Sequence, residues 1–309
     1  MDIFLQQLVN GIVLGAIYAL VALGYTMVYG ILGLINFAHG EVVMIGALAA
    51  LTAVQLLMGS GVALPGPLIA ALGLLFALPV CMALGYAIER VAYRPLRAAP
   101  RLAALITAIG VSILLQNAAM LVWGRQYHSF PALLPATPHT FAGATVSDLQ
   151  IFIVALAAAI MAGLIALVHR TRLGRAMRAT AQNPEVAGLM GVNINTVISL
   201  TFVIGSALAA VAGIMVAAYY GIAHYFMGFM LGLKAFTAAV LGGIGNLAGA
   251  MLGGLLLGVI ESLGAGYIGP LTGGFLGSHY QDVFAFVVLI LVLVFRPAGL
   301  LGERVAERS

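Results

Sequence analysis

The stretch GYTMVYGILGLINFAHGEVVMIGALAAL, residues 24–51, places an amide, an imidazole and a carboxylate inside a long apolar run. These groups belong to Asn36, His39 and Glu41, and the chain stays hydrophobic for tens of residues on both sides. Glycines interrupt the run before it resumes. The stretch therefore predicts a membrane helix that is broken and then continues, with polar groups close to the break.

The composition of the whole chain agrees with a membrane environment. Of its 309 residues, 63% are hydrophobic and only 7% are charged, and the mean hydropathy is +1.15. A soluble domain carries about 25% charged residues, so a globule of this composition could not solvate its surface. The apolar runs lack the alternation of a transmembrane barrel. We expect an all-α, polytopic transmembrane helical bundle forming one domain, 1–309.

The same composition argues against several other classes of protein. The net charge of +4 comes from grouped arginines, which a membrane explains better than nucleic acid does. The single cysteine, Cys81, cannot form an internal disulfide, and the six histidines share no metal-ligand spacing. The only lysine, Lys234, is not in a phosphate-binding loop. We expect no enzyme activity, no metal and no bound cofactor in this chain.

Basic residues give the expected orientation in the membrane. Eleven of the thirteen fall in three clusters: Arg90, Arg94, Arg97 and Arg101; Arg170, Arg172, Arg175 and Arg178; Arg296, Arg304 and Arg308. The positive-inside rule places these clusters, and with them the C-terminus, in the cytoplasm. The polar, proline-rich segment 124–148 is then an external loop, with Trp123 and Tyr127 as interfacial anchors.

Apolar runs predict eight to ten spans. They lie at about 3–24, 41–58, 64–89, 102–123, 149–169, 197–220, 229–245, 247–266 and 282–296. The start lacks a basic region, so 3–24 is expected to be a first span and not a cleaved signal peptide. Whether 25–40 crosses fully or enters and turns back is open, and so is the side of the N-terminus.

A second glycine-broken segment lies near the end of the chain. It reads LGGIGNLAGAMLGGLLLGVIE, residues 241–261, and the break falls at Gly242, Gly243 and Gly245. Corresponding breaks in two halves of a transporter indicate an internal repeat and a site near the bilayer midplane. We therefore include these glycines among the candidate pathway residues. Glycines at four-residue spacing, such as Gly11 and Gly15, indicate close packing of helices or, alternatively, a sliding surface for gating.

The ionisable groups allow two interpretations. An ionisable side chain at membrane depth is a functional candidate, so Asn36, His39 and Glu41 are candidates for a substrate pathway or gate. If this segment is instead a wet turn near an interface, Asn36 caps a short helix and Glu41 lies in the first turn of the next. Lys234 and Glu261 pose the same question, between an ion pair and a role in substrate passage.

The segment of about 170–196 is too long for a simple turn between two spans. Asn183 and Pro184 mark a helix start, with Glu185 in the first turn and an end at Gly191. A second helix is expected to begin near Asn195 and enter the membrane. The short helix is expected to present Val186, Ala187, Leu189 and Met190. An exposed apolar helix flanked by arginines fits the groove of a soluble partner, or else rests on the membrane surface.

Six ordered blocks resemble one protein family. They are YTMVYGILGLINFAHGEV (25–42), ERVAYRPLR (89–97), LITAIGVSILLQN (105–117), GRAMRATAQNPEVAGLMGVN (174–193), LTFVIGSALAAVAG (200–213) and KAFTAAVLGGIGNLAGAMLGGLLLGVIE (234–261). The sequence resembles the permease subunit of bacterial branched-chain amino-acid ABC importers, of the Leu/Ile/Val high-affinity type. The resemblance covers nearly the whole chain, apart from variable segments at 124–148 and 267–279.

The resemblance implies a larger machine in the bacterial inner membrane. Such a permease pairs with a second related permease subunit and two ATP-binding subunits, which use the ATP, and a periplasmic binding protein delivers the substrate. The 183–193 helix matches the family's cytoplasmic coupling loop, which implies that Asn183, Pro184, Glu185, Ala187, Gly188 and Gly191 contact an ATP-binding subunit. Related permeases also serve urea, short-chain amides or a broader set of amino acids.

Two rival functions compete with this one. An ion-coupled secondary transporter would use Glu41, Glu261 or Asp282 as its coupling carboxylate, but the docking-type loop argues against it. A membrane-embedded enzyme or scaffold would need an assembled polar site or a soluble interaction domain, and the sequence indicates neither.

Overall fold

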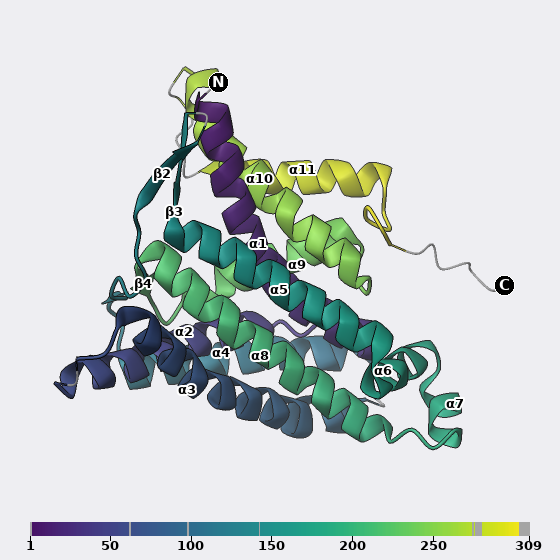
Figure 1. Cartoon of the computed structure of the whole chain (residues 1–309). Coiled ribbons are helices and arrows are strands. Elements are labelled where there is room, and N and C mark those ends of the chain that lie inside the picture. Colours follow the sequence, from purple (N-terminus) through teal and green to yellow (C-terminus); the bar gives the residue numbers. More distant parts are fainter. Residues whose placement is uncertain are drawn as a thin grey trace.

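The computed structural model describes residues 2–61, 63–97, 99–141, 143–273, 275 and 280–302 (Figure 1). The helices are α1 (Asp2–Leu32), α2 (His39–Gly59), α3 (Gly66–Ala87), the π-helix η1 (Ile88–Tyr93), the 3-10 helix η2 (Arg94–Leu96), α4 (Arg101–Trp123), α5 (Asp148–Arg170), α6 (Arg172–Gln182), α7 (Pro184–Leu189), α8 (Ile194–Tyr220), α9 (Met227–Gly242), α10 (Leu247–Leu271) and α11 (Gln281–Phe295). The strands β1 (His128–Ser129) and β4 (Ile222–Ala223) pair antiparallel, as do β2 (Pro138–Phe141) and β3 (Ala144–Ser147). Arg304 and Arg308 lie outside the described residues.

The polytopic helical bundle is confirmed. Seven helices of the described chain are long and apolar enough to cross a membrane, by length and composition. Two shorter apolar helices, α9 and the Ala285–Phe295 part of α11, follow the same pattern. The expected eight to ten spans are reached only if these two also cross. The segment 25–40, whose path the sequence left open, is not a span of its own, because α1 continues to Leu32 and α2 begins at His39.

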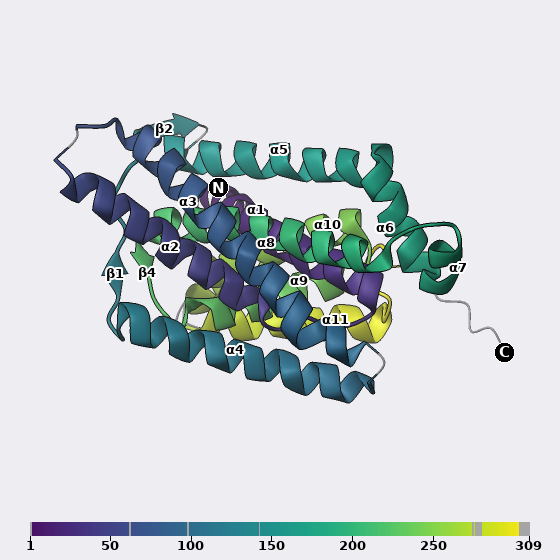
Figure 2. The same cartoon turned by 90° about the horizontal axis from the view of Figure 1, so that it is seen from below.

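The core lies along α1, α2 and α8. Most residues of these helices are buried, whereas α3, α4 and α5 expose large apolar side chains on their outer faces. Figure 2 shows α4 and α5 on opposite flanks of the bundle, with α1 and α8 between them. Apolar side chains on the outer face of a helical bundle are typical of contact with lipid.

Glycines allow α1 and α10 to pack in direct backbone contact, as the four-residue spacing predicted. A Cβ added at Gly11 would lie 2.6 Å from the Val259 Cα, and one at Gly15 would lie 2.7 Å from the Leu255 Cα. On the other helix, Gly254 and Gly258 are equally close to α1. In lipid there is no hydrophobic force between helices, so close packing of small residues supplies much of the attraction.

Contacts at the ends of the bundle settle which segments share a side. The Gln6 side chain accepts a hydrogen bond from the Thr145 amide at 2.7 Å and donates one to the Thr145 carbonyl at 3.1 Å. The N-terminal end of α1 therefore lies on the side of the 124–148 segment. At the opposite end, the Leu301 amide donates to the Gly242 carbonyl, and Gly245 lines a small pocket together with Arg178.

The two glycine-broken segments meet at this second end. α1 ends at Leu32, and Gly33 adopts a left-handed φ of 63°. α9 ends at Gly242, and Gly245, with a φ of 96°, lies beside Gly30, where an added Cβ would be 3.5 Å from the Gly245 carbonyl oxygen. The breaks are therefore neighbours in space although 215 residues separate Gly30 from Gly245 in the sequence.

Candidate functional site

His39 lies inside the bundle and not at a wet interface. Its side chain packs against Gly24 of α1 and Gly205 of α8, and a Cβ at Gly24 would collide with the imidazole ring. The Tyr25 ring meets it edge-on, with centroids 5.0 Å apart. Gly24 precedes the end of α1 by eight residues, so the His39 ring contacts α1 about 12 Å before that helix ends, at 1.5 Å per residue. The interpretation of 35–41 as a solvated turn near an interface is wrong.

Asn36 is also buried, at 4% exposure, and it does not cap α2 through its side chain. Its Oδ1 accepts a hydrogen bond of 3.0 Å from the Tyr93 hydroxyl of η1. The expected side-chain cap is therefore wrong, because the Asn36 amide oxygen is bound by a hydroxyl of another helix instead.

Glu41 lies in the first turn of α2, as expected, but it is fully buried. Its Oε1 accepts hydrogen bonds from the Ser112 hydroxyl at 3.0 Å and the Gln116 amide at 2.7 Å, both on α4. Its Oε2 has no hydrogen-bond partner in the described chain and faces Gly228 of α9. No basic residue of the described ranges forms an ion pair with it. We call His39, Glu41, Ser112 and Gln116 the α2 junction.

Lys234 and Glu261 do meet, as the ion-pair interpretation predicted. Lys234 Nζ lies 2.6 Å from Glu261 Oε1 and 2.8 Å from Asp282 Oδ1. The Tyr18 hydroxyl donates to Glu261 Oε2 at 3.0 Å. We call these four residues the Lys234 cluster; they join α1, α9, α10 and α11. Two carboxylates face one ammonium, so their formal charges sum to −1.

The segment of about 170–196 forms two short helices, α6 and α7, before α8 begins. The Asn183 side chain accepts a hydrogen bond from the Val186 amide and begins α7, and Asn193 does the same for Thr196 at the start of α8. Gly191, with a φ of 86°, ends the short helix. The predicted starts and end of these helices are confirmed. The helix α6, which precedes α7, was not predicted.

Three of the four apolar side chains expected on the surface of α7 are exposed. Leu189 is 87% exposed, Met190 81% and Val186 52%. Ala187 is only 4% exposed, so its expected presentation to a partner is wrong. The reason is the tight turn after α7, in which the Val192 amide donates to the Ala187 carbonyl and folds the chain over that side of the helix. Gly188 packs near Ile194.

Known proteins match this sequence over almost its full length. Residues 7–293 match the family described as branched-chain amino acid transport system / permease component. The chain belongs to this family. A high-affinity branched-chain amino acid transport system permease protein, BraD of Pseudomonas aeruginosa, is 50% identical over 99% of this chain and 98% of its own length. LivH of Escherichia coli K12, with the same description, is 47% identical over 99% and 97%.

One solved structure also aligns with the permease. It is a chain of PsaBC from Streptococcus pneumoniae in complex with Fab, with a TM-score of 0.47 and 15% identity, covering 96% of this chain and 90% of that one. This similarity is too low to support an argument about residues.

The glycines at the second break of the permease pack backbone against backbone. A Cβ at Gly242 would collide with the Gly249 carbonyl, and one at Gly243 would collide with Gly302. Gly243 also has a φ of 108°, which side chains rarely adopt. Gly245 borders a small pocket of about 100 Å³. These positions fix the turn between α9 and α10 and its contact with the C-terminal segment.

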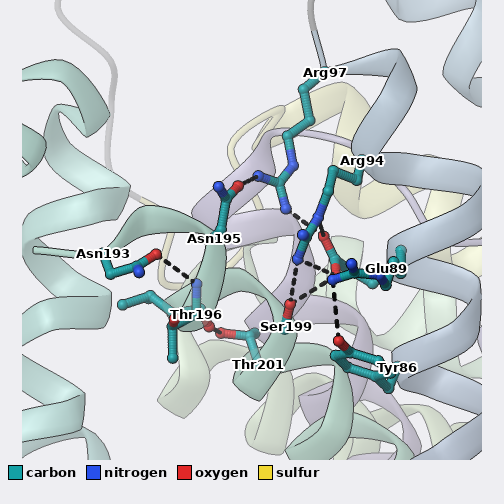
Figure 3. A network of polar contacts seen from close by, with 11 residues as sticks. Tyr86, Glu89, Arg94, Arg97, Asn193, Asn195, Thr196, Ser199 and Thr201 are labelled. Atoms are coloured by element: carbon teal, nitrogen blue, oxygen red, sulfur yellow. Dashed lines mark hydrogen bonds and ion pairs between the residues drawn. The ribbon is translucent and has the colours of Figure 1, made fainter.

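A buried network between η1 and α8 was not predicted (Figure 3). Glu89 of η1 is fully buried and forms ion pairs with Arg94 and Arg97. Ser199 of α8 donates to Glu89 at 2.7 Å, and Arg97 donates to Asn195 at 2.6 Å. The network therefore ties the end of α3 to the first turns of α8. The only signal in the sequence was an acid inside an arginine cluster, in the block ERVAYRPLR.

Among the described residues, no group of three His, Cys, Asp or Glu side chains is placed to hold a metal ion. The permease has buried carboxylates, one buried ammonium and an exposed apolar surface element, and these belong to separate parts of the bundle.

Proposed function

We propose that this chain is the membrane-spanning subunit of an ATP-binding-cassette importer that moves leucine, isoleucine and valine across the bacterial inner membrane. It pairs with a second related permease subunit, and two ATP-binding subunits dock on its cytoplasmic face. A periplasmic binding protein delivers the amino acid on the other face. The proposal rests most heavily on end-to-end similarity to branched-chain amino acid permeases at 47–50% identity.

The contacts of α7 support a role in coupling. Val186, Leu189 and Met190 form an exposed apolar patch, which we call the α7 patch. Exposed apolar patches of this kind mark sites of protein contact. α7 connects to α8 through only four residues, 190–193, and the Asn193 cap and the Gly191 turn order this link. A movement of the α7 patch is therefore transmitted to α8 through a short and ordered link.

The Glu89 network extends this coupling to a second helix. Because Ser199 and Asn195 of α8 bind Glu89 and Arg97, a movement of the first turns of α8 also moves the end of α3. α8 then runs 27 residues through the bundle to Tyr220 on the opposite side. Binding and release of ATP in the partners shifts the permease between outward-open and inward-open states through these two helices.

Uptake of labelled leucine, with urea in parallel, in cells with and without the gene tests this function. Each uptake is run with an uncoupler and, separately, with ATP depleted. We expect leucine uptake that needs the gene, survives the uncoupler and stops without ATP. Gene-dependent uptake of urea alone would change the substrate, and uptake that collapses with the uncoupler while ATP remains high would favour a secondary transporter.

The coupling role has a separate test in the α7 patch. Leu189→Asp places a charge on a side chain that is 87% exposed, so the bundle should assemble normally. We expect substrate-stimulated ATP hydrolysis to be lost in the assembled transporter. Gln182→Asp, which adds the same charge to an exposed position at the end of α6, is the matched control and should retain it. Normal coupling in Leu189→Asp would contradict the assignment.

A further inference from the structure

A groove of about 430 Å³ opens between the end of α3 and the start of α8. Tyr86 of α3, Arg90 of η1 and Arg94 of η2 line one side of it, and the first turns of α8 line the other. Figure 3 shows Tyr86 and Arg94 across from Thr196 of α8. Arg94 and Ser199 belong both to this groove and to the Glu89 network, so a ligand here would contact both helices that the network joins.

The groove lies at the end of the bundle away from the 124–148 segment. α3 begins beside that segment, because a Cβ at Gly66 would collide with the Leu133 carbonyl oxygen. α8 ends beside it, because the Phe130 amide donates to the Gly221 carbonyl at 2.9 Å. The groove is formed by the other ends of both helices, on the side that the arginine clusters predict to be cytoplasmic. It therefore lies at the level of the anionic headgroups of a cytoplasmic leaflet.

The lining changes from polar to apolar along the groove. On α8, Asn195 and Thr196 are followed one and two turns later by Leu200 and Val203. Leu200 is 37% exposed and Tyr86 41%, so this apolar half opens on the outer face of the bundle and not into its core. A soluble anion would use only the polar half. A phospholipid fits the whole groove, because its phosphate lies at the interface and its acyl chains lie deeper.

The two arginines keep hydrogen-bond donors for a ligand. Arg90 donates from Nη1 to the Tyr86 hydroxyl at 3.2 Å, and its other N–H groups have no acceptor in the described part of the chain. Arg94 uses Nε and Nη2 to bind Glu89 and Ser199, and no acceptor for its Nη1 is found among the described residues. A guanidinium carries five N–H donors in a planar fork that matches a phosphate. Both side chains can therefore donate to an oxyanion without leaving their present partners.

The charge of the polar half favours an anion. Among the described residues, Glu89 is the acid that pairs with Arg94 and Arg97, and Arg90 forms no ion pair. One carboxylate and three guanidinium groups leave a net formal charge of +2. A lipid with a net negative phosphodiester is attracted by this charge, whereas a zwitterionic headgroup brings an ammonium that is repelled.

α8 supplies neutral donors opposite the arginines. Thr196 is exposed and carries a hydroxyl. The Asn195 Oδ1 accepts a hydrogen bond of 2.6 Å from Arg97, which leaves the NH2 group of this amide for a ligand. A phosphate between the two sides of the groove would therefore have charged donors on one side and neutral donors on the other.

We propose that this groove is a binding site for an anionic phospholipid, whose phosphate binds Arg90, Arg94 and Thr196 and whose acyl chain lies along Leu200 and Val203. A lipid bound in this way joins η1 and η2 to the first turns of α8, the same elements that the Glu89 network joins. The site depends on the membrane-spanning bundle and on no property of the transported substrate.

Photolabelling of the reconstituted transporter tests the site. Proteoliposomes of phosphatidylcholine receive a trace of phosphatidylglycerol that carries a diazirine near the carbonyl of one acyl chain, and the labelled peptides are mapped by mass spectrometry. Phosphatidylcholine with the same photoreactive chain is the matched probe. We expect the phosphatidylglycerol probe to label the α8 segment 197–204 severalfold more than the phosphatidylcholine probe. Equal labelling by both probes would overturn the anionic site, and absence of labelling by either would overturn it by showing that protein covers the groove.

Exchange of a single arginine separates the site from general surface charge. Arg90→Gln removes one positive charge, and the ion pairs of Glu89 do not use Arg90. We expect it to reduce labelling by the phosphatidylglycerol probe to the level of the phosphatidylcholine probe, whose own labelling should stay unchanged if the variant is folded. Arg175→Gln on α6 removes the same charge at an exposed position outside the groove and should label like the wild type. Equal loss in both variants would contradict a specific site.

Competition identifies the source of the phosphate. An excess of unlabelled phosphatidylglycerol should displace the probe, whereas glycerol phosphate on both sides of the membrane should not, because it lacks the chain that lies along Leu200. Displacement by glycerol phosphate would show a site for a soluble anion and overturn the lipid. Thr196→Val keeps the shape of the side chain without its hydroxyl, and it should reduce labelling less than Arg90→Gln does. Labelling of Thr196→Val at the level of the wild type would overturn the placement of the phosphate against α8.

Discussion

The α2 junction and the Lys234 cluster bury acids in the same bundle by opposite means. Glu261 is 1% exposed and receives an ammonium and a phenol hydroxyl. Glu41 is equally buried, but it receives only a hydroxyl and an amide, and one of its oxygens has no partner in the described chain. The Lys234 cluster therefore depends on each of its charges, whereas the α2 junction depends on shape and hydrogen bonds.

Removal of the ammonium should break the Lys234 cluster and give the largest effect. Lys234→Met keeps the length of the side chain but removes the ammonium that both Glu261 and Asp282 face. Loss of one partner from a buried ion pair costs about 3–5 kcal/mol, so we expect a large fall in the free energy of unfolding and in the yield of folded protein. Denaturation of the purified protein in detergent measures the change.

The double variant Lys234→Met/Glu261→Gln is the control for this interpretation. It removes one negative charge together with the positive one, and it should recover part of the lost stability. A single variant as stable as the wild type would show that the cluster does not depend on its cation.

Crowding at His39 should give the next largest effect and sharpens the description of the α2 junction. Gly24→Ala places a methyl group against the imidazole ring, and overpacking of a tight core costs typically about 1–3 kcal/mol. The same denaturation measurement should therefore show a moderate loss. The double variant Gly24→Ala/His39→Ala should relieve the clash, so its stability should approach that of His39→Ala alone. If the losses of the two single variants add in the double variant, the two residues do not compete for space.

Helix ends and buried contacts differ in how far the sequence could predict them. Asn183 and Gly191 were predicted correctly as a helix start and a helix end, because caps and left-handed turns depend on residues a few positions apart. The burial of His39 was not predicted, because it depends on Gly24 and Gly205, which lie on two other helices. The Glu89 network was missed for the same reason, since Ser199 is 110 residues away.

The contrast between Ala187 and its neighbours shows the limit of local patterns even within one short helix. The composition of α7 correctly predicted an apolar surface at Leu189 and Met190. It could not predict that Ala187 faces inward, because that depends on how Val192 folds back and on where α8 begins.

Replacement of the Glu41 charge should give the smallest effect and tests the comparison at its most sensitive point. Glu41→Gln keeps an oxygen that can accept from Ser112 and Gln116, and it removes a charge that has no cation in the described structure. We expect the free energy of unfolding to change by less than about 1 kcal/mol and leucine uptake to persist. Glu41→Ala leaves the Ser112 and Gln116 donors unpaired and should cost about 1–3 kcal/mol. If Glu41→Gln folds normally but transports nothing, the negative charge itself takes part in transport, and the α2 junction then belongs to the substrate pathway.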